Sequence, residues 1–373
     1  FREILGDLNN KSIERVIIYD LESTDIGKLA NLTTNRDYPI GLSFKFIANY
    51  APLSKEDRFQ IAEFKEIAAK GASNYPLLGV FRADVDNLGF LISKGLAKEG
   101  KDDNHSISRF ATLSRELDMF FTRDINKIAE EDDIYLTYSG GDDLFAVGSW
   151  VKIIDFAQKV EKAFSEYVCS NPYITISGGI NINKPNYPIS RLAQQTGDQE
   201  KLAKGEGKES TNKMESKYRQ SSNKIIEKNK IAMLDVVLEW DDFEKKIDIA
   251  KELSRVITDN ESLNSISSSF IYRLLTITSQ AFDKNGKINV EKIHRLNGQL
   301  HYLFARREMT ESAINKNGER MDDEIKKIQK MLTNYFLTKD IETKKRWFET
   351  FKIIAYYVIY KNRKLKEKNE YIS

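Results

Sequence analysis

The chain has 373 residues, of which 40% are hydrophobic and 31% are charged, as in water-soluble globular proteins with two or three domains. Its formal net charge at pH 7 is only +2, so the overall charge does not indicate a nucleic-acid-binding protein, although local basic surfaces are compatible with it. The single cysteine, Cys169, excludes a disulfide framework or a cysteine-rich zinc site within the chain, and it favours a reducing, cytoplasmic location.

The beginning of the chain carries no recognisable chemistry. Residues 1–74 mix short strand-like runs, at 16–19 and 40–47, with polar turns and a charged helical stretch at 56–70, and we predict that they form a small α+β connector. Because the first residue is Phe1 rather than Met, we expect a portion of a longer protein. No signal peptide opens the sequence, and no apolar run approaches the roughly 18 residues of a membrane span, so we expect no membrane contact.

A regular apolar pattern extends from residue 75 to residue 244. A nearly continuous apolar run at 77–83 is typical of a strand buried on both faces, and apolar residues at three- and four-residue intervals over 107–128 predict one long amphipathic helix. The other predicted elements are strands at 134–138 and 144–147 around a hairpin turn, a helix at 150–168, a strand at 173–182, a helix at 188–204 and a strand at 231–237. This β-α-β-β-α-β order predicts a ferredoxin-like sheet with helices on one face.

The rest of the chain is predicted to be helical. Residues 205–223 are polar and lack periodicity, so we expect a flexible loop there. From residue 245 to residue 373, apolar stripes such as Phe270, Leu274 and Ile277 indicate a helical bundle. The predicted fold class is therefore α+β, with a ferredoxin-like domain at 75–244 followed by an α-helical domain at 245–373.

Two aspartate clusters follow strands of the predicted sheet. Asp84 and Asp86 come directly after the first strand, and Asp142 and Asp143 lie in the hairpin turn. The first strand and the hairpin are neighbours in this topology, so the clusters can meet. Nucleotidyl transfer uses carboxylates to hold two Mg²⁺ or Mn²⁺ ions about 3.5–4 Å apart. Either cluster alone could simply belong to a turn or be a solvated charge at a strand end. Together they favour a two-metal site on a nucleoside triphosphate.

Backbone groups beside both clusters are suited to phosphate binding. After Ser139, the pair Gly140 and Gly141 allows unusual backbone angles and a close approach of phosphate to the main chain. The segment 87–89, which consists of Asn87, Leu88 and Gly89, begins the next predicted helix, where backbone N–H groups could face a triphosphate. We therefore predict that these two segments bind the nucleotide.

Two motifs taken together resemble a known family. Residues 80–89 (VFRADVDNLG) and 139–143 (SGGDD) resemble the large Palm-containing subunit of type III CRISPR effector complexes, with the III-A branch most similar. Shorter stretches at 189–193, 202–204, 228–231 and 237–240 also resemble the second Palm domain of that subunit. The resemblance covers residues 45–240 well, and the helical remainder fits the subunit's C-terminal domain more loosely.

The resemblance implies a cytoplasmic enzyme that makes cyclic oligoadenylates from ATP with Mg²⁺ or Mn²⁺. Its partners would be the other subunits of the complex, with CRISPR RNA and target RNA. Asp142 and Asp143 are then the catalytic metal ligands, and the strand-end ligand is Asp84, with Asp86 as a second candidate. Lys204 and Lys228 are the implied contacts to the triphosphate, although a solvated lysine at a helix end is the alternative for Lys204.

The chain departs from the complete family pattern. Members of the family also carry a first Palm domain, a zinc-binding segment and often a His-Asp nuclease domain. The three histidines here include no His-Asp pair, so we expect no such nuclease in this chain. Since the family forms its product between two Palms, we expect this chain to supply the metal-binding half of the site.

Two other functions stay open. A diguanylate cyclase has a similar Palm, but such cyclases place an acidic residue and then Phe after Gly-Gly-Asp, whereas Leu144 follows Asp143 here. Alternatively, the Palm is a catalytically silent scaffold that docks other subunits and RNA. Its basic stretches, at 344–346 and 361–364, would then contact RNA or acidic partners, and ordinary solvated helix faces are the simpler explanation of such stretches.

Overall fold

The computed structural model describes residues 47–57, 59–71, 75–92, 107–206, 228–257, 266–283, 286–312 and 323–363. The chain divides into two compact units, Phe1–Lys45 and Phe46–Ser373, and all described residues belong to the second unit. The predicted strand at 16–19, nearly all of the strand at 40–47 and most of the loop at 205–223 lie outside the described residues. The division into three domains at residues 74 and 244 stays a prediction.

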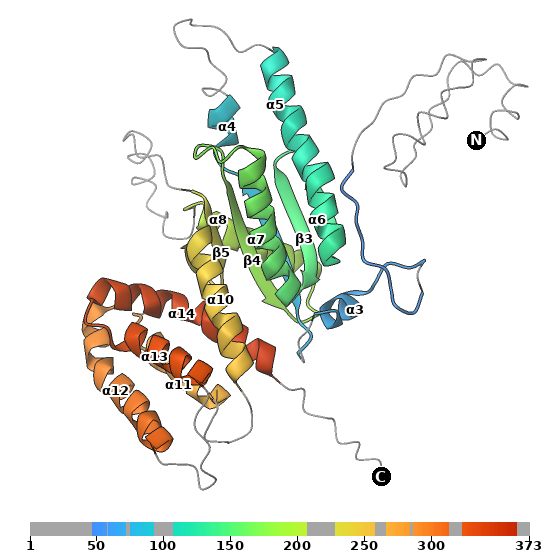
Figure 1. Cartoon of the computed structure of the whole chain (residues 1–373). Coiled ribbons are helices and arrows are strands. Elements are labelled where there is room, and N and C mark those ends of the chain that lie inside the picture. Colours follow the sequence, from blue (N-terminus) through green and yellow to red (C-terminus); the bar gives the residue numbers. More distant parts are fainter. Residues whose placement is uncertain are drawn as a thin grey trace, which may run out of the picture. The chain divides into compact units, whose positions relative to one another are not determined.

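A mixed sheet forms the centre of the described part of the chain (Figure 1). Its strand order is β2-β3-β1-β4-β5-β6. The strands are β1 Leu78–Val85, β2 Tyr135–Gly140, β3 Asp143–Ser149, β4 Ile176–Asn183, β5 Lys230–Met233 and β6 Val236–Glu239. Strand β1 lies between β3 and β4 and is antiparallel to both, while β5 joins β4 in parallel. The first four strands therefore have the predicted ferredoxin-like arrangement, extended at one edge by β5 and β6.

Helices cover both faces of this sheet, so the prediction of helices on one face was wrong. On β1, Phe81 and Ala83 pack into one core cluster, which includes α7 (Trp150–Tyr167), whereas Leu78 and Val80 pack into a second cluster. The second cluster contains residues of α3 (Phe64–Ala69) and α8 (Ile189–Ala203). A strand that is apolar on both faces requires cover on both, and α3 and α8 supply it.

Helix α8 approaches the sheet closely at a glycine of β4. A Cβ atom added at Gly179 would lie 2.4 Å from the backbone N of Glu200, a distance that side-chain atoms do not tolerate. The missing side chain therefore lets the last turns of α8 lie directly on β4. This contact fixes the position of the helix end that carries Glu200 and Lys204.

The predicted helix over 107–128 exists but is not uniform. It consists of α5 (Ile107–Met119), a π-helical turn η2 (Phe120–Asp124) and α6 (Ile125–Asp132) in direct succession. The side chains of Phe120 and Phe121 are buried within η2. A π turn inserts one residue into the helical repeat, which regular three- and four-residue spacing does not reveal.

The predicted strand at 231–237 is a hairpin instead. Strands β5 and β6 pair antiparallel around Leu234 and Asp235, whose φ angles are 56° and 61°. Two consecutive positive φ angles are typical of a type I′ turn, which usually contains Asn-Gly rather than Leu-Asp. The side chain of Gln199 on α8 both donates to and accepts from Asp235, and these bonds support the turn.

The C-terminal part is a helical bundle, as predicted. Its helices are α10 Trp240–Val256, α11 Ser268–Ser279, α12 Val290–Ser312, α13 Asp323–Leu337 and α14 Ile341–Asn362. Tyr335 and Trp347 stack between α13 and α14 with ring centroids 4.1 Å apart. Trp150 of α7 meets Tyr357 of α14 at 5.0 Å, so the bundle shares its core with the sheet domain. In the part of the chain that the structure describes, no helix has the length and apolar character needed to cross a membrane.

Candidate functional site

The end of β1 and the tip of the β2–β3 hairpin lie next to each other. Asp84 and Asp143 are direct cross-strand partners, and the backbone N–H of Val85 donates to the carbonyl oxygen of Asp142 at 3.1 Å. The hairpin turn consists of Gly141 and Asp142, and the φ of 69° at Gly141 matches the first central position of a type II′ turn. The predicted meeting of the two aspartate clusters is thus present for three of the four aspartates.

Three carboxylates crowd this point of the sheet. Burial raises the pKa of Asp142, and the neighbouring Asp84 raises it further. Burial also raises the pKa of Asp143, which the Arg82 guanidinium partly opposes and the negative charge of Asp84 reinforces. Like charges directly opposite each other destabilise a sheet. Such an unfavourable arrangement in a folded protein is a common sign of a functional site.

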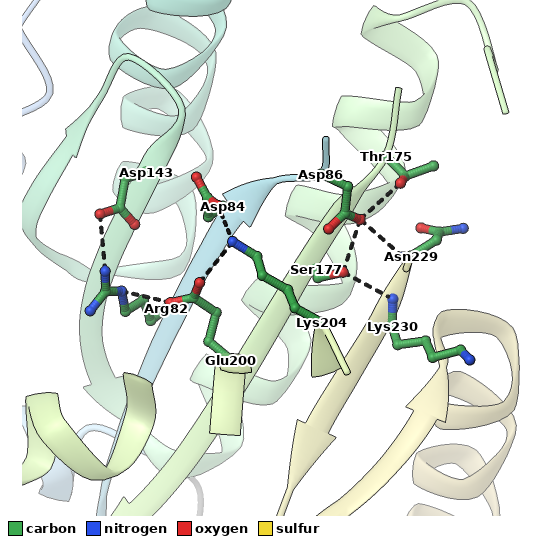
Figure 2. A network of polar contacts seen from close by, with 10 residues as sticks. All are labelled: Arg82, Asp84, Asp86, Asp143, Thr175, Ser177, Glu200, Lys204, Asn229 and Lys230. Carbon is green, nitrogen blue, oxygen red and sulfur yellow. Dashed lines mark hydrogen bonds and ion pairs between the residues drawn. The ribbon is translucent and has the colours of Figure 1, made fainter. Parts of the chain in front are cut away.

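Two cations lie among these carboxylates (Figure 2). The Arg82 guanidinium contacts Asp143 Oδ2 at 3.3 Å and Glu200 Oε2 at 2.8 Å. The Lys204 ammonium contacts Glu200 Oε1 at 2.9 Å and also donates to Asp84 Oδ2. The five side chains therefore form a row of alternating charge, which we call the charge row: Asp143, Arg82, Glu200, Lys204 and Asp84.

Lys204 is protonated and buried in the charge row. Its side chain is only 10% exposed, and that of Glu200 is 9% exposed. Burial on its own would lower the pKa of Lys204, but the hydrogen bonds to Asp84 and Glu200 outweigh this effect and raise the pKa. In the structure Lys204 is therefore paired with Asp84, a predicted metal ligand, and is not a solvated lysine at the helix end.

Asp86 belongs to a different group of contacts. Its side chain is buried, and Oδ2 accepts hydrogen bonds from Thr175 Oγ1 at 2.8 Å, Ser177 Oγ at 2.8 Å and the backbone N–H of Asn229 at 2.9 Å. These bonds tie the end of β1 to β4 and to the start of β5 (Figure 2). Lys228 precedes Asn229 and so lies beside this group in the chain, and its contact with a triphosphate stays a prediction.

The other predicted nucleotide-binding residues lie in the hairpin and in the segment that follows β1, and they differ in burial. The hydroxyl of Ser139 is buried and donates to the carbonyl oxygen of Phe121, so it supports the hairpin from the core side. Gly140 has no neighbouring atom that an added Cβ would meet, so its surface is open. Asn87 adopts a left-handed conformation before the single turn α4 (Leu88–Phe90), and space is also open at Gly89. Nucleotide contacts by these residues stay predictions.

The residues present fit a divalent metal by donor type. Among the described residues, no three His, Cys, Asp or Glu side chains are already gathered as a metal site. Oδ1 of Asp143 is nevertheless buried without a hydrogen-bond partner. The carboxylate of Asp84 forms an ion pair with the Lys204 ammonium. Carboxylate oxygens are the donors that Mg²⁺ and Mn²⁺ prefer. A metal can use these oxygens once Lys204 moves away from Asp84.

Sequence reasoning missed two members of the charge row. Arg82 precedes Asp84 by two residues on a strand, so both side chains lie on the same face of the sheet. Glu200 precedes Lys204 by four residues on a helix, so both lie on one helical face. These spacings were visible in the sequence. The face of the sheet that α8 covers was not.

Residues 77–212 match the model of the Cas10/Cmr2 family described as "second palm domain". This region is therefore similar to a Cas10/Cmr2 second palm domain. The predicted resemblance to the large Palm-containing subunit of type III-A CRISPR complexes is thereby confirmed, and two curated relatives agree with it. Both are described as "CRISPR system single-strand-specific deoxyribonuclease Cas10/Csm1 (subtype III-A)".

The relative from Enterococcus italicus is 34% identical over 240 residues, which cover 63% of this chain and 26% of the relative. The relative from Streptococcus thermophilus is 39% identical over 141 residues, covering 38% of this chain and 18% of the relative. The chain thus matches about a quarter or less of the length of these Cas10/Csm1 proteins.

Solved Csm1 structures have the same fold. The Csm1–Csm4 cassette in complex with pppApApA has a TM-score of 0.58 at 20% identity, over 85% of this chain and 41% of that chain. Csm1 of T. onnurineus has a TM-score of 0.55 at 21% identity, over 84% of this chain and 40% of that chain. The likeness extends beyond the palm domain, since the matched share of this chain exceeds the region of the family model.

Proposed function

We propose that this chain supplies the ATP-binding, two-metal half of a cyclic oligoadenylate synthase in a type III-A CRISPR complex. The observation that carries the proposal is the pairing of Asp84 with Asp143 beside Asp142, in a Cas10/Cmr2 second palm domain. A cluster of half-buried carboxylates at the end of two strands is costly unless cations compensate it. Nucleotidyl transfer provides such cations in the form of its metal ions.

Each residue of the site has a role in the proposed reaction. Asp84, Asp142 and Asp143 hold Mg²⁺ or Mn²⁺, which would supply the Lewis acidity that activates a ribose hydroxyl and stabilises the leaving pyrophosphate. Lys204 and Arg82 lie beside these carboxylates and can neutralise the charge of the triphosphate after they leave Asp84 and Asp143. The open backbone around the turn admits phosphate oxygens.

The structural neighbours favour ATP as the nucleotide. Solved Csm1–Csm4 cassettes include complexes with pppApApA, with cA4 and with one ATP, at TM-scores of 0.58, 0.52 and 0.50. We extend their adenine ligands and their partner subunit to this chain as part of the proposal. CRISPR RNA and target RNA would be reached through the assembled complex. The deoxyribonuclease in the names of the curated relatives belongs to proteins of which this chain matches 26% and 18% of the length.

The proposal is tested by product formation in the assembled complex. ATP, Mn²⁺ and target RNA are incubated with complexes that contain the wild-type chain or the Asp142→Asn/Asp143→Asn variant. Asp198→Asn, which removes an exposed carboxylate from α8, is the matched control. We expect oligoadenylates from the wild type and the control and none from the double variant. Equal yields from all three would contradict the site, and turnover of GTP in place of ATP would favour the diguanylate-cyclase alternative.

A further inference from the structure

Glu200 is the only acidic member of the charge row that lies outside the three predicted metal ligands. It extends from the last turn of α8, its side chain is 9% exposed, and its two oxygens contact different cations. Oε2 faces Arg82 Nε at 2.8 Å, and Oε1 faces Lys204 Nζ at 2.9 Å. Figure 2 shows Glu200 between these two cations, with Asp143 and Asp84 beyond them.

Metal binding creates an electrostatic problem in this row. Asp84 and Asp143 each contact a cation through Oδ2, and a metal that binds these same oxygens displaces those cations. A buried charge that loses its partner costs far more free energy than an intact ion pair contributes. A metal would therefore bind weakly if Lys204, whose side chain is only 10% exposed, were left unpaired, whereas the 38% exposed Arg82 would lose less.

Glu200 lies where it can remain the partner of both cations. Because each of its oxygens already contacts one cation, Lys204 and Arg82 keep a negative partner after they leave the aspartates. The backbone of Glu200 is held close to β4, since its N lies against Gly179. Neither the aspartates nor the triphosphate needs direct contact with Glu200 for this role.

We propose that Glu200 is a positioning residue that keeps Lys204 and Arg82 paired while Asp84 and Asp143 bind metal. This inference rests on the proposed function, because it assumes that the aspartates are metal ligands. It assigns Glu200 no contact with substrate. Its effect on the metal passes through the two cations, in the way that partners of metal ligands commonly tune affinity.

The test is a titration of the full chain with Mn²⁺, in which the electron paramagnetic resonance signal reports the concentration of free ion. We expect Glu200→Gln to weaken Mn²⁺ binding about 10- to 100-fold, the range found when supporting residues around metal ligands are removed. Asp198→Asn removes the same charge from an exposed position of the same helix and should bind like the wild type. Asp84→Asn, which alters a proposed ligand, should lose most of the binding.

A double variant distinguishes positioning from a general loss of structure. In Glu200→Gln/Lys204→Met both members of the ion pair are neutral, so the substitution of Glu200 leaves no unpaired ammonium group at position 204. The variant loses one charge of each sign. We expect Glu200→Gln to weaken Mn²⁺ binding less in the Lys204→Met background than in the wild type, because coupled residues show non-additive effects. Thermal unfolding of each variant accompanies the titration. If Glu200→Gln weakens Mn²⁺ binding equally with Lys204 present and with Lys204→Met, Glu200 does not act through Lys204 and the inference is wrong.

The outcomes separate this inference from the proposed function. Loss of binding in Asp84→Asn together with unchanged binding in Glu200→Gln would overturn the positioning role and leave the metal site standing. Absence of Mn²⁺ binding in the wild type, or equal binding in the wild type and Asp84→Asn, would overturn both.

Discussion

Lys204 at the end of α8 donates a hydrogen bond to the carboxylate of Asp84 at the end of β1. These residues come from opposite ends of the palm domain in sequence, and the close approach of α8 at Gly179 brings them together. In this state the Lys204 ammonium group is bound to the Asp84 carboxylate, which we propose as a metal ligand. The metal and Lys204 therefore compete for Oδ2 of Asp84.

Removal of Lys204 should destabilise the metal-free chain. Lys204→Met leaves Glu200 with one cation fewer and Asp84 without its hydrogen bond, and breaking a buried ion pair on one side costs about 3 kcal/mol. Urea unfolding in the presence of a chelator measures this difference. Lys201→Met, at an exposed position of the same helix, is the control and should change the free energy of unfolding little. Equal losses in both variants would show that the charge row is not stabilising.

Addition of Mn²⁺ should recover part of that loss. A ligand that binds only the folded state raises its stability, and without Lys204 the ion has no competitor at Asp84. We expect saturating Mn²⁺ to raise the melting temperature of Lys204→Met by more than that of the wild type. A smaller increase in the variant would contradict the competition between Lys204 and the metal.

The stability of the metal-free chain should depend on the ionisation of Asp142. Burial and then the charge of Asp84 raise the pKa of Asp142 above 3.8, so the folded state binds a proton more readily than the unfolded state. The ionised form is thus unfavourable in the folded chain, and this cost is complete above the folded pKa and disappears as the pH falls toward the unfolded value. Asp142→Asn should therefore be more stable than the wild type at pH 7.

Chemical denaturation over a range of pH checks this prediction. The advantage of Asp142→Asn should shrink as the pH is lowered toward about 4, where the wild-type carboxyl group becomes protonated in both states. A constant difference at every pH would mean that charge on Asp142 is not the cause. Asp155→Asn, on α7, is a control outside the charge row.

Asp86 and Asp84 should give opposite results although only one residue lies between them. Asp86→Ala removes the acceptor of Thr175, Ser177 and the N–H of Asn229, and we expect a loss of about 3 kcal/mol in the free energy of unfolding. Its Mn²⁺ affinity at temperatures where it is folded should stay near that of the wild type. Asp84→Asn should lose Mn²⁺ affinity with a smaller effect on the fold. Loss of metal binding in folded Asp86→Ala would make Asp86 a ligand as well.

Two glycine substitutions test how α8 is positioned. Gly179→Ala would place a Cβ atom 2.4 Å from the N of Glu200 and force α8 away from β4, which should cost about 1–3 kcal/mol. Gly298→Ala in α12 meets no atom within 4 Å and should stabilise its helix by up to about 1 kcal/mol. Thermal unfolding distinguishes the two. A stable Gly179→Ala variant with unchanged Mn²⁺ binding would show that the close approach of α8 is not required.

Much of the palm was predictable because local signals agreed there. The apolar run before Asp84 and the glycines before Asp142 indicated a buried strand and a tight turn, and the topology then required them to meet. The turn at Leu234 was missed because Leu is rare at positive φ, so its identity argued for a continuous strand. Periodicity also could not show which face of the sheet α8 covers.

The same limit explains why Glu200 was missed. A glutamate near the end of a helix is normally solvated, and only tertiary packing against Gly179 buries it. Arg82 stood next to a predicted site residue, but its partner on α8 was unknown. The aspartates were therefore predictable from sequence patterns, whereas the cations that balance them required the fold.

The proposed function requires that Asp84, Asp142 and Asp143 hold divalent metal ions on ATP. Anomalous scattering from crystals of the chain grown with Mn²⁺ and a non-hydrolysable ATP analogue tests it most directly. We expect anomalous density within about 2.0–2.6 Å of oxygen atoms of these carboxylates, with Lys204 moved away from Asp84. Density for bound nucleotide without a metal peak at these aspartates, or with Lys204 still on Asp84, would contradict it.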